Sequence, residues 1–363
     1  AEQSWNVIGN AHITSANLAK VRSRTVARRR ATVRPVTADD VGRFLTRWHG
    51  LDEPSSGAAA LSEVVSQLSG VRLPLSQLDL VLSGRIADYD PAALDALLSS
   101  GMLRWRGAGA IGATDGWIEL WAVGIPAHEC CSELSPEATT ILERLQGGGS
   151  WTIAELFADA RDHISTRTVV QELVWSGSIT SASLSTLRQL CGTSAAQVRV
   201  RDPRPGARRS RRLLRIPPTD PILATTWRAW SDDKSDPATL ALRDLDLLID
   251  RQGIICRPGF ETHHLPTTFS DVRRLATRLE ERGELQRGWY CPKLGGVQFT
   301  TGQVAAGLRN QDPTGMVVLA ASDPANPYGS VLAWPTDPDC HPTRSAGSVV
   351  VINDGHLVAH LER

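Results

Sequence analysis

Residues 90–106 read Asp-Pro-Ala-Ala-Leu-Asp-Ala-Leu-Leu-Ser-Ser-Gly-Met-Leu-Arg-Trp-Arg and predict a short helix, a glycine stop and a strand. Asp90 suits the N-cap, and Pro91 suits the first helical position, where no N–H is needed. One helix face is apolar at spacings of three and four: Leu94, Leu97 and Leu98. Gly101 can take the left-handed conformation that ends a helix. The strand then alternates, with apolar residues at Leu103 and Trp105.

The same unit occurs twice more, in residues 170–181 and 275–287. In each copy a leucine lies four residues before the glycine and an aliphatic residue lies two after it. The later copies are Leu173, Gly177, Ile179 and Leu279, Gly283, Leu285. Hairpin candidates, 112–122 and 288–300, follow the first and third copies. This order is typical of a winged helix, in which the second helix of the helix-turn-helix reads DNA and the hairpin is the wing. The alternative is three unrelated amphipathic helices with ordinary C-caps.

Composition indicates a globular chain without a uniform charge. The 363 residues are 41% hydrophobic and suffice for two to four domains. Basic and acidic residues balance at 39 each, which argues against a uniformly basic nucleic-acid wrapper. All basic residues except Lys20, Lys234 and Lys293 are arginine. Arginine suits phosphate contacts, although with so much alanine we attribute its excess first to a GC-rich genome.

The sequence also predicts the cellular compartment and the absence of a metal site. No apolar run approaches the roughly 18 residues of a membrane helix, and the first 30 residues do not read as a signal peptide. The six cysteines lack C-x-x-C spacing, so we expect reduced thiols in a cytoplasmic protein with no membrane partner. His263 and His264 lack a third ligand nearby, so we interpret them as loop residues and expect no metal.

Turn and capping signals divide the chain into an α+β succession of tandem winged-helix (helix-turn-helix) domains and a small C-terminal β module. Thr37 with Asp40 forms a capping box, and Asn353-Asp354-Gly355 predicts a type I′ hairpin. In the second module a short strand and a helix stand where a wing is expected. The predicted segments are a basic connecting segment 1–36, winged helices 37–125 and 126–196, a basic linker 197–220, a winged helix 221–312 and a β module 313–363.

Arginines also cluster outside the repeats. Residues 18–34 are rich in them, including Arg28, Arg29 and Arg30, and predict a helix lying on a phosphate backbone. A solvated connecting helix is the alternative. Residues 199–218 combine eight arginines with prolines and are interpreted first as a flexible loop.

Several stretches resemble the C-terminal region of Lhr-type large helicase-related proteins. They begin upstream with Arg-Phe-Leu-Thr-Arg-Trp at 43–48 and residues 85–97. In the C-terminal third they are Leu-Gly-Gly-Val-Gln-Phe at 294–299, Leu-Ala-Ala-Ser-Asp-Pro-Ala-Asn-Pro-Tyr-Gly at 319–329, and residues 347–363. The Asp-Pro-Ala-Asn-Pro-Tyr-Gly run is the most specific of them.

The resemblance implies that this chain belongs to the family's C-terminal extension and not to its motor. Full-length members are bacterial ATP-dependent DNA helicases with two RecA-like domains, which use ATP and Mg, followed by tandem winged helices and a β-barrel. The present sequence contains no G-x-x-x-x-G-K-[ST] loop. We therefore expect no cofactor in this chain, and we expect the upstream helicase core to be its partner.

The arrangement also resembles AlkZ-type DNA glycosylases, which carry a Gln-x-Gln or Gln-x-Asp pair that activates water. In this sequence Arg72 and Pro74 stand where that pair is expected, and neither side chain can act as the base. Asp354 is the candidate carboxylate in their place, although an aspartate before glycine is usually a turn residue.

Our first hypothesis is a DNA-binding region of a helicase in DNA repair that contacts single- or double-stranded DNA through its winged helices. The predicted contacts in the later copies are Thr166, Arg167, Thr168, Ser270, Arg273 and Arg274, and those of the first strand are Arg104 and Arg106. The other two hypotheses are a glycosylase acting on a flipped base and a homo-oligomerisation module. Whether this region is itself an enzyme stays open.

Overall fold

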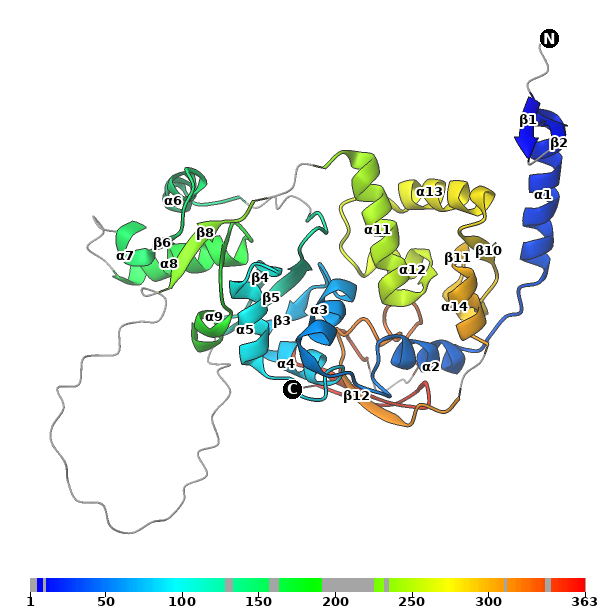
Figure 1. The fold of residues 1–363 in the computed structure, drawn as a ribbon. Helices are drawn as coiled ribbons and strands as arrows, with labels where there is room; N and C mark the ends of the chain where they lie inside the picture. The colour runs from blue at the N-terminus through cyan, green and yellow to red at the C-terminus, as the bar shows by residue number, and fades with distance from the viewer. Residues whose placement is uncertain are drawn as a thin grey trace. The chain divides into compact units, whose positions relative to one another are not determined.

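The computed structural model describes residues 5–8, 11–127, 133–156, 163–190, 225–231, 235–309, 312–336 and 341–362 (Figure 1). The chain divides into two compact units. The first comprises residues 1–71, 80–88 and 233–363, and the second comprises residues 72–79 and 89–232. The predicted linker at 197–220 lies outside the described residues. Among the described residues, every helix is too short or too polar to span a bilayer.

The first unit begins with a hairpin and a basic helix. The hairpin pairs β1 (Trp5–Ile8) with β2 (Ala11–Thr14), and α1 (Ser15–Ala31) follows it directly. Thr14 caps α1 by accepting a hydrogen bond from the backbone N–H of Asn17. The helix predicted from the arginine-rich residues is therefore confirmed.

Two helices of the same unit follow, α2 (Ala38–Trp48) and α3 (Gly57–Gln67). The predicted capping box is present at the start of α2: Thr37 accepts from the N–H of Asp40, whose carboxylate accepts from the N–H of Thr37. The apolar side of α2 packs against segments that are distant in the sequence. Phe44 packs into a core with Tyr290, Leu319 and Val350, which are far along the sequence.

The third copy of the repeat forms a complete winged helix, called here the third module. Its elements are α11 (Pro237–Gln252), β9 (Ile254–Ile255), α12 (Arg257–Glu261), α13 (Phe269–Arg282), β10 (Gln286–Gly288), the 3-10 helix η1 (Pro292–Leu294) and β11 (Gln298–Thr300). The strands form an antiparallel sheet in the order β10-β11-β9. Leu248, Val272, Ala276 and Phe299 are buried in its core.

After α14 (Gly302–Gly307) comes the C-terminal sheet, formed by β12 (Met316–Ala320), β13 (Val349–Asn353) and β14 (His356–Leu361). The strands pair in chain order, and the described strands do not close into the expected barrel. The predicted turn between β13 and β14 is present, with Asp354 and Gly355 both at positive φ. A short strand is also expected at 331–334, but the structure has only a single bridge there, between Tyr328 and Leu332.

The second unit contains the stretch on which the prediction began. Asp90 caps α5 (Pro91–Ser99) by accepting from the N–H of Ala92, and Leu94 and Leu98 are buried. The strand β4 (Leu103–Ile111) pairs with β5 (Asp115–Ala122), and β3 (Leu73–Pro74) completes the sheet on the other side of β5. The helix α4 (Leu75–Ser83) precedes α5 and crosses from one unit to the other.

The second copy lies in a helical module of the second unit. Its elements are α6 (Pro136–Gln146), β6 (Trp151–Thr152), α7 (Ile153–Leu156), α8 (His163–Trp175), β7 (Ile179–Ser181), α9 (Ser185–Leu190) and β8 (Thr226–Ala229). A strand and then a helix after α8 confirm the predicted order. The sheet order is β6-β8-β7, so a strand from beyond the arginine-rich residues 199–218 lies between two strands that precede them.

The shared glycine ends the helix in all three copies. Gly101, Gly177 and Gly283 have φ values of 78°, 76° and 87°, a region that side chains with a Cβ rarely adopt. The buried residue that follows each glycine by two positions then starts the strand or lies just before it: Leu103, Ile179 and Leu285. The repeated helix–glycine–strand unit is therefore confirmed.

Candidate nucleic-acid interface

The helix α13 has one apolar and one basic side because its sequence keeps the two at helical spacing. Val272, Ala276 and Leu279 are buried against the module core. The opposite side carries residues at spacings of three and four: Ser270, Arg273, Arg274, Thr277 and Arg278. The capping pair Thr268 and Asp271 begins the helix, with the Thr268 hydroxyl donating to the Asp271 carboxylate at 2.6 Å.

These polar residues meet the wing across a shallow groove of about 400 Å³. Arg287 lines the groove from β10 and Phe299 from β11, and Val297 lines it from the position just before β11. We call Ser270, Arg273, Arg274, Thr277, Arg278 and Arg287 together the arginine face. A second groove of about 530 Å³ runs between the N-terminal ends of α11 and α13, and Arg274 and Arg278 line it as well.

The arginine face is exposed and only lightly paired. Arg274 donates to Asp271 at 3.1 Å, but its side chain is 66% exposed. A pair this exposed contributes little energy, so the guanidinium can exchange a carboxylate for a phosphate at small cost. Arg273, Arg278 and Arg287 are exposed on the same face.

Glu280 holds the wing against α13 and anchors α1. Its buried carboxylate accepts from the backbone N–H of Arg287 at 3.2 Å and from Arg30 at 2.8 and 2.5 Å. The pKa of Arg30 is raised, mainly by that hydrogen bond to Glu280. Arg29 donates to the carbonyl of Gly283 at 3.3 Å, at the C-terminal end of α13.

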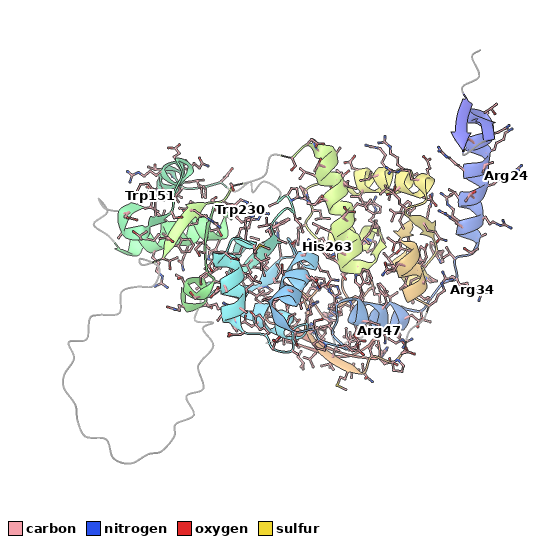
Figure 2. All side chains as sticks on the ribbon, in the orientation of Figure 1. Arg24, Arg34, Arg47, Trp151, Trp230 and His263 are labelled. Carbon is pink, nitrogen blue, oxygen red and sulfur yellow. The ribbon has the colours of Figure 1, made fainter. Side chains whose placement is uncertain are left out.

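The arginines of the predicted basic helix therefore differ in their contacts. Arg29 and Arg30 fix α1 to the third module, whereas Arg28 is exposed near the end of the helix. Arg24 lies on α1 and Arg34 follows it, and both are exposed (Figure 2). The structure leaves Arg28 as the candidate DNA contact of the three.

The first strand pair is an inner element and not a free wing. Arg106 is buried and pairs with the buried Glu119 at 2.7 Å, which removes it from any surface that DNA could reach. A Cβ on Gly107 would overlap the carbonyl of Val174 in α8. The indole N–H of Trp105 donates to the carbonyl of Ser181 at 2.9 Å. The DNA contact predicted for Arg106 is therefore wrong, because its guanidinium is buried against Glu119 and the rings of Trp121 and Trp230, while α8 and β7 cover the other side of the strand.

Arg104 is half-buried on the same strand. Its guanidinium lies 5.0 Å from the ring centre of Trp230 and donates to the carbonyl of Ser231 at 3.4 Å. Trp230 follows β8, as Figure 2 shows. The contact orients Arg104 along the protein surface and gives it a structural role beside the one predicted.

The predicted contacts of the second copy separate by burial. They lie in the first turns of α8, where Thr166 is buried and Arg167 and Thr168 are exposed. A buried hydroxyl cannot reach a phosphate, so the contact predicted for Thr166 is wrong. Arg167 is the remaining charged candidate of this copy.

Three members of the arginine face, Thr277, Arg278 and Arg287, are not among the contacts predicted from the sequence. Arg278 follows Arg274 by one helical turn, so helical spacing alone could have added it. Predicting Arg287 requires knowledge of the pairing of β10 with β11. This pairing places Arg287 beside Phe299 on the side of the sheet that faces α13.

The positions considered for glycosylase chemistry are engaged in structural contacts. Arg72 donates to Glu119 at 3.2 Å, and Pro74 lies in β3. Both oxygens of Glu119 accept hydrogen bonds, from Arg72 on one side and from Arg106 and Trp121 on the other. Asp354 accepts from the N–H of Thr314 at 3.2 Å and pairs with Arg43 at 3.4 Å. Among the described side chains, no group of three His, Cys, Asp or Glu is placed to hold a metal ion.

Two family models match the chain, both described as a winged-helix domain of the large helicase-related protein. One matches residues 36–123 and the other residues 234–317. The second match contains α13 and both strands of the wing. The resemblance found in the sequence is confirmed.

Two curated relatives align with 94% of this chain. The Lhr helicase/probable uracil glycosylase of Mycolicibacterium smegmatis is 35% identical over 367 residues, and the Lhr helicase/uracil glycosylase of Escherichia coli is 29% identical over 391 residues. The chain spans 24% and 25% of their respective lengths.

A solved structure with a similar fold is the DNA glycosylase AlkZ of Streptomyces sahachiroi. The TM-score is 0.54 with 15% sequence identity, over 90% of this chain and 87% of that one. At this identity the likeness concerns the fold alone.

Proposed function

Because this chain carries two winged-helix domains of the large helicase-related protein family, we propose that it is a DNA-binding region of a DNA-repair helicase. The arginine face of the third module is its principal contact with DNA. The observation that carries the proposal is the convergence of four exposed arginines from a helix and a wing on one groove. The ATP- and Mg-dependent motor belongs to the upstream helicase core, which is the partner of this region.

The geometry of the arginine face suits a phosphate backbone. Arginine presents several N–H donors in a planar fork that matches phosphate oxygens, and Ser270 and Thr277 add hydroxyls at the same surface. The core side of α13 is held by apolar packing and the wing by Glu280, so both elements are positioned before DNA arrives. Little ordering of backbone is then required on binding.

The direct test is a DNA-binding assay on the double variant Arg273→Ala/Arg278→Ala. Both side chains are exposed, so we expect the fold to survive and the affinity for a fluorescent duplex to fall by about tenfold or more at low salt. Arg309→Ala is a control that removes one positive charge elsewhere, since this exposed arginine after α14 is outside the residues that line the groove. Unchanged affinity in the double variant would refute the assignment of the arginine face.

Uracil excision is a second candidate, favoured by the names of the two relatives that align with most of the chain. Asp354 is the carboxylate to test, because its side chain is 40% exposed. Asp354→Asn keeps a side chain that tolerates the left-handed turn but removes the base. Abasic sites that the wild type forms on uracil-containing DNA and the variant does not form would support the activity. If the wild type forms no abasic sites on this DNA, the glycosylase proposal is refuted.

Self-association is the third candidate, favoured by the outer side of the C-terminal sheet. Met316 and Val318 of β12 and Leu361 of β14 are exposed there, on the side opposite the buried Val350. A second copy of this chain is the proposed occupant, because a net charge of zero does not oppose the approach of two copies. Light scattering over a range of concentrations tests it. We expect an oligomer that Val318→Lys dissociates, and a monomer at all concentrations would exclude it.

A further inference from the structure

A tryptophan of the third module, Trp289, is exposed two residues after Arg287 of the arginine face. Trp289 follows β10 and is 49% exposed, whereas Trp105, Trp121 and Trp227 are buried in the second unit. Tryptophan is enriched among the side chains that dominate binding energy at interfaces. Its exposure makes Trp289 a candidate for contact with a ligand held by the arginine face.

The strand register shows which way Trp289 faces. Arg287 pairs with Phe299 and Gly288 with Gln298, so side chains alternate between the groove side and the opposite side. Gly288 is packed against Val33 and Tyr290 is buried, which marks the opposite side. Continued by one residue past the end of β10, the alternation places Trp289 on the side of Arg287, outside the residues that line the groove.

The loop that carries Trp289 is held rigidly. The buried side chain of Gln298 accepts from the N–H groups of Tyr290 and Cys291 at 2.8 and 3.0 Å and donates to the carbonyl of Cys291 at 2.8 Å. Leu294 of η1 is buried beneath the same loop. A tryptophan on a fixed loop loses little conformational freedom when it binds a flat partner.

We propose that Trp289 stacks on an unpaired base, so that the third module prefers DNA with a junction between duplex and single strand over uniform duplex. The proposal rests on the arginine face binding the backbone, as proposed above. Bases inside a duplex are already stacked on both sides and offer no free face to a side chain on the wing. At a junction the first unpaired base offers one, and Lys293 in the same exposed loop adds a positive charge for its phosphate.

The test compares wild type, Trp289→Ala and Trp289→Phe on two DNA molecules. One is a blunt duplex and the other is the same duplex with a single-stranded tail. The tailed DNA is prepared in two forms, one with a 3′ tail and one with a 5′ tail. Loss of base stacking on an aromatic side chain weakens binding by between about fivefold and about 100-fold. We expect this loss for Trp289→Ala on tailed DNA, a change within twofold on blunt duplex, and near wild-type binding by Trp289→Phe.

A fluorescent base analogue gives a second readout. With 2-aminopurine as the first unpaired base, we expect wild type and Trp289→Phe to quench its emission and Trp289→Ala to leave it unquenched. Equal losses on both DNA molecules, or no loss on either, would overturn the proposal even if Arg273→Ala/Arg278→Ala weakens binding. If the wild type binds neither molecule at low salt, the proposed function itself fails.

Discussion

Asp323 is a carboxylate without exposed surface inside the stretch that most specifically resembles the helicase family. Arg85, equally buried, donates to both of its oxygens at 2.8 and 2.7 Å, and the N–H of Ala325 donates at 2.8 Å. Burial raises the pKa of Asp323, but the charge and hydrogen bonds of Arg85 outweigh it and lower the pKa below its usual range. The side chain thus serves the packing of the C-terminal region and is not available to DNA.

The substitution Asp323→Ala leaves Arg85 charged and buried without its partner. We expect a loss of about 3–5 kcal/mol in the free energy of unfolding, measured by chemical denaturation. Glu261→Ala is the control, because Glu261 and its partner Arg257 are both more than 60% exposed. Its cost should stay below about 1 kcal/mol. A loss as small as the control's would mean that the pair is hydrated in solution.

The histidine beside this pair predicts how stability depends on pH. Burial and then the charge of Arg85 lower the pKa of His49 from 6.5 to about 3. Its ring accepts from Arg85 at 3.2 Å and donates to the carbonyl of Arg251 at 2.8 Å, which fixes the neutral tautomer. Because the unfolded chain binds a proton more readily, His49 contributes stability that is present above pH 6.5 and is lost as the pH falls toward 3.

The measurement is the free energy of unfolding at a series of pH values. We expect it to fall between pH 6.5 and pH 4, with a smaller slope in His49→Gln. Part of the slope remains in that variant, because burial also lowers the pKa of His263 well below its usual value. A wild-type profile that is level across this interval contradicts the burial of a neutral His49.

At the scale of elements, α2 and the β13–β14 turn meet backbone to backbone. A Cβ on Gly42 would overlap the carbonyl of Gly355, and a Cβ on Gly355 would overlap the carbonyl of Asp39. The hydroxyl of Tyr328 donates to the carbonyl of Gly355 at 3.0 Å and holds the turn from the other side. This contact joins a helix near the beginning of the described chain to the last two strands.

Gly42→Ala therefore forces the helix and the turn apart. We expect a loss of about 1–3 kcal/mol in the free energy of unfolding, because neither backbone can move aside as a side chain would. Gly302→Ala is the control, because Gly302 is also a helical residue, the first of α14. Nothing lies within 4 Å of the added Cβ. If both variants unfold alike, the close approach of α2 to the turn is absent in solution.

The repeated elements show which parts of the fold are local enough to predict. The N-caps, the glycine stops and the type I′ turn are decided by neighbouring residues, and all are present. The strand β8 follows residues 191–224 and lies between β6 and β7, which both precede those residues. No local sequence pattern predicts this pairing. Arg106 fails for a related reason: alternation predicts an outward side chain, but Glu119 and the rings of Trp121 and Trp230 enclose its guanidinium on that side of β4.

At the scale of the molecule, a chain that is neutral overall has local concentrations of positive charge. The 39 basic and 39 acidic residues cancel overall, yet four of the arginines line a single groove of the third module. The sequence predicts three members of the arginine face, Ser270, Arg273 and Arg274, and helical spacing could add Thr277 and Arg278. Arg287 joins them only through strand pairing. The total charge is therefore a poor guide to nucleic-acid binding in this chain.

The salt dependence of DNA binding measures how many phosphates the arginine face contacts. Each phosphate contact releases about one counterion, so the slope of log K against log salt counts those contacts. We predict a steep negative slope for the wild type, reduced by about two in Arg273→Ala/Arg278→Ala and unchanged in Arg309→Ala. Identical slopes in the wild type and the double variant would contradict the account and place the DNA on another surface.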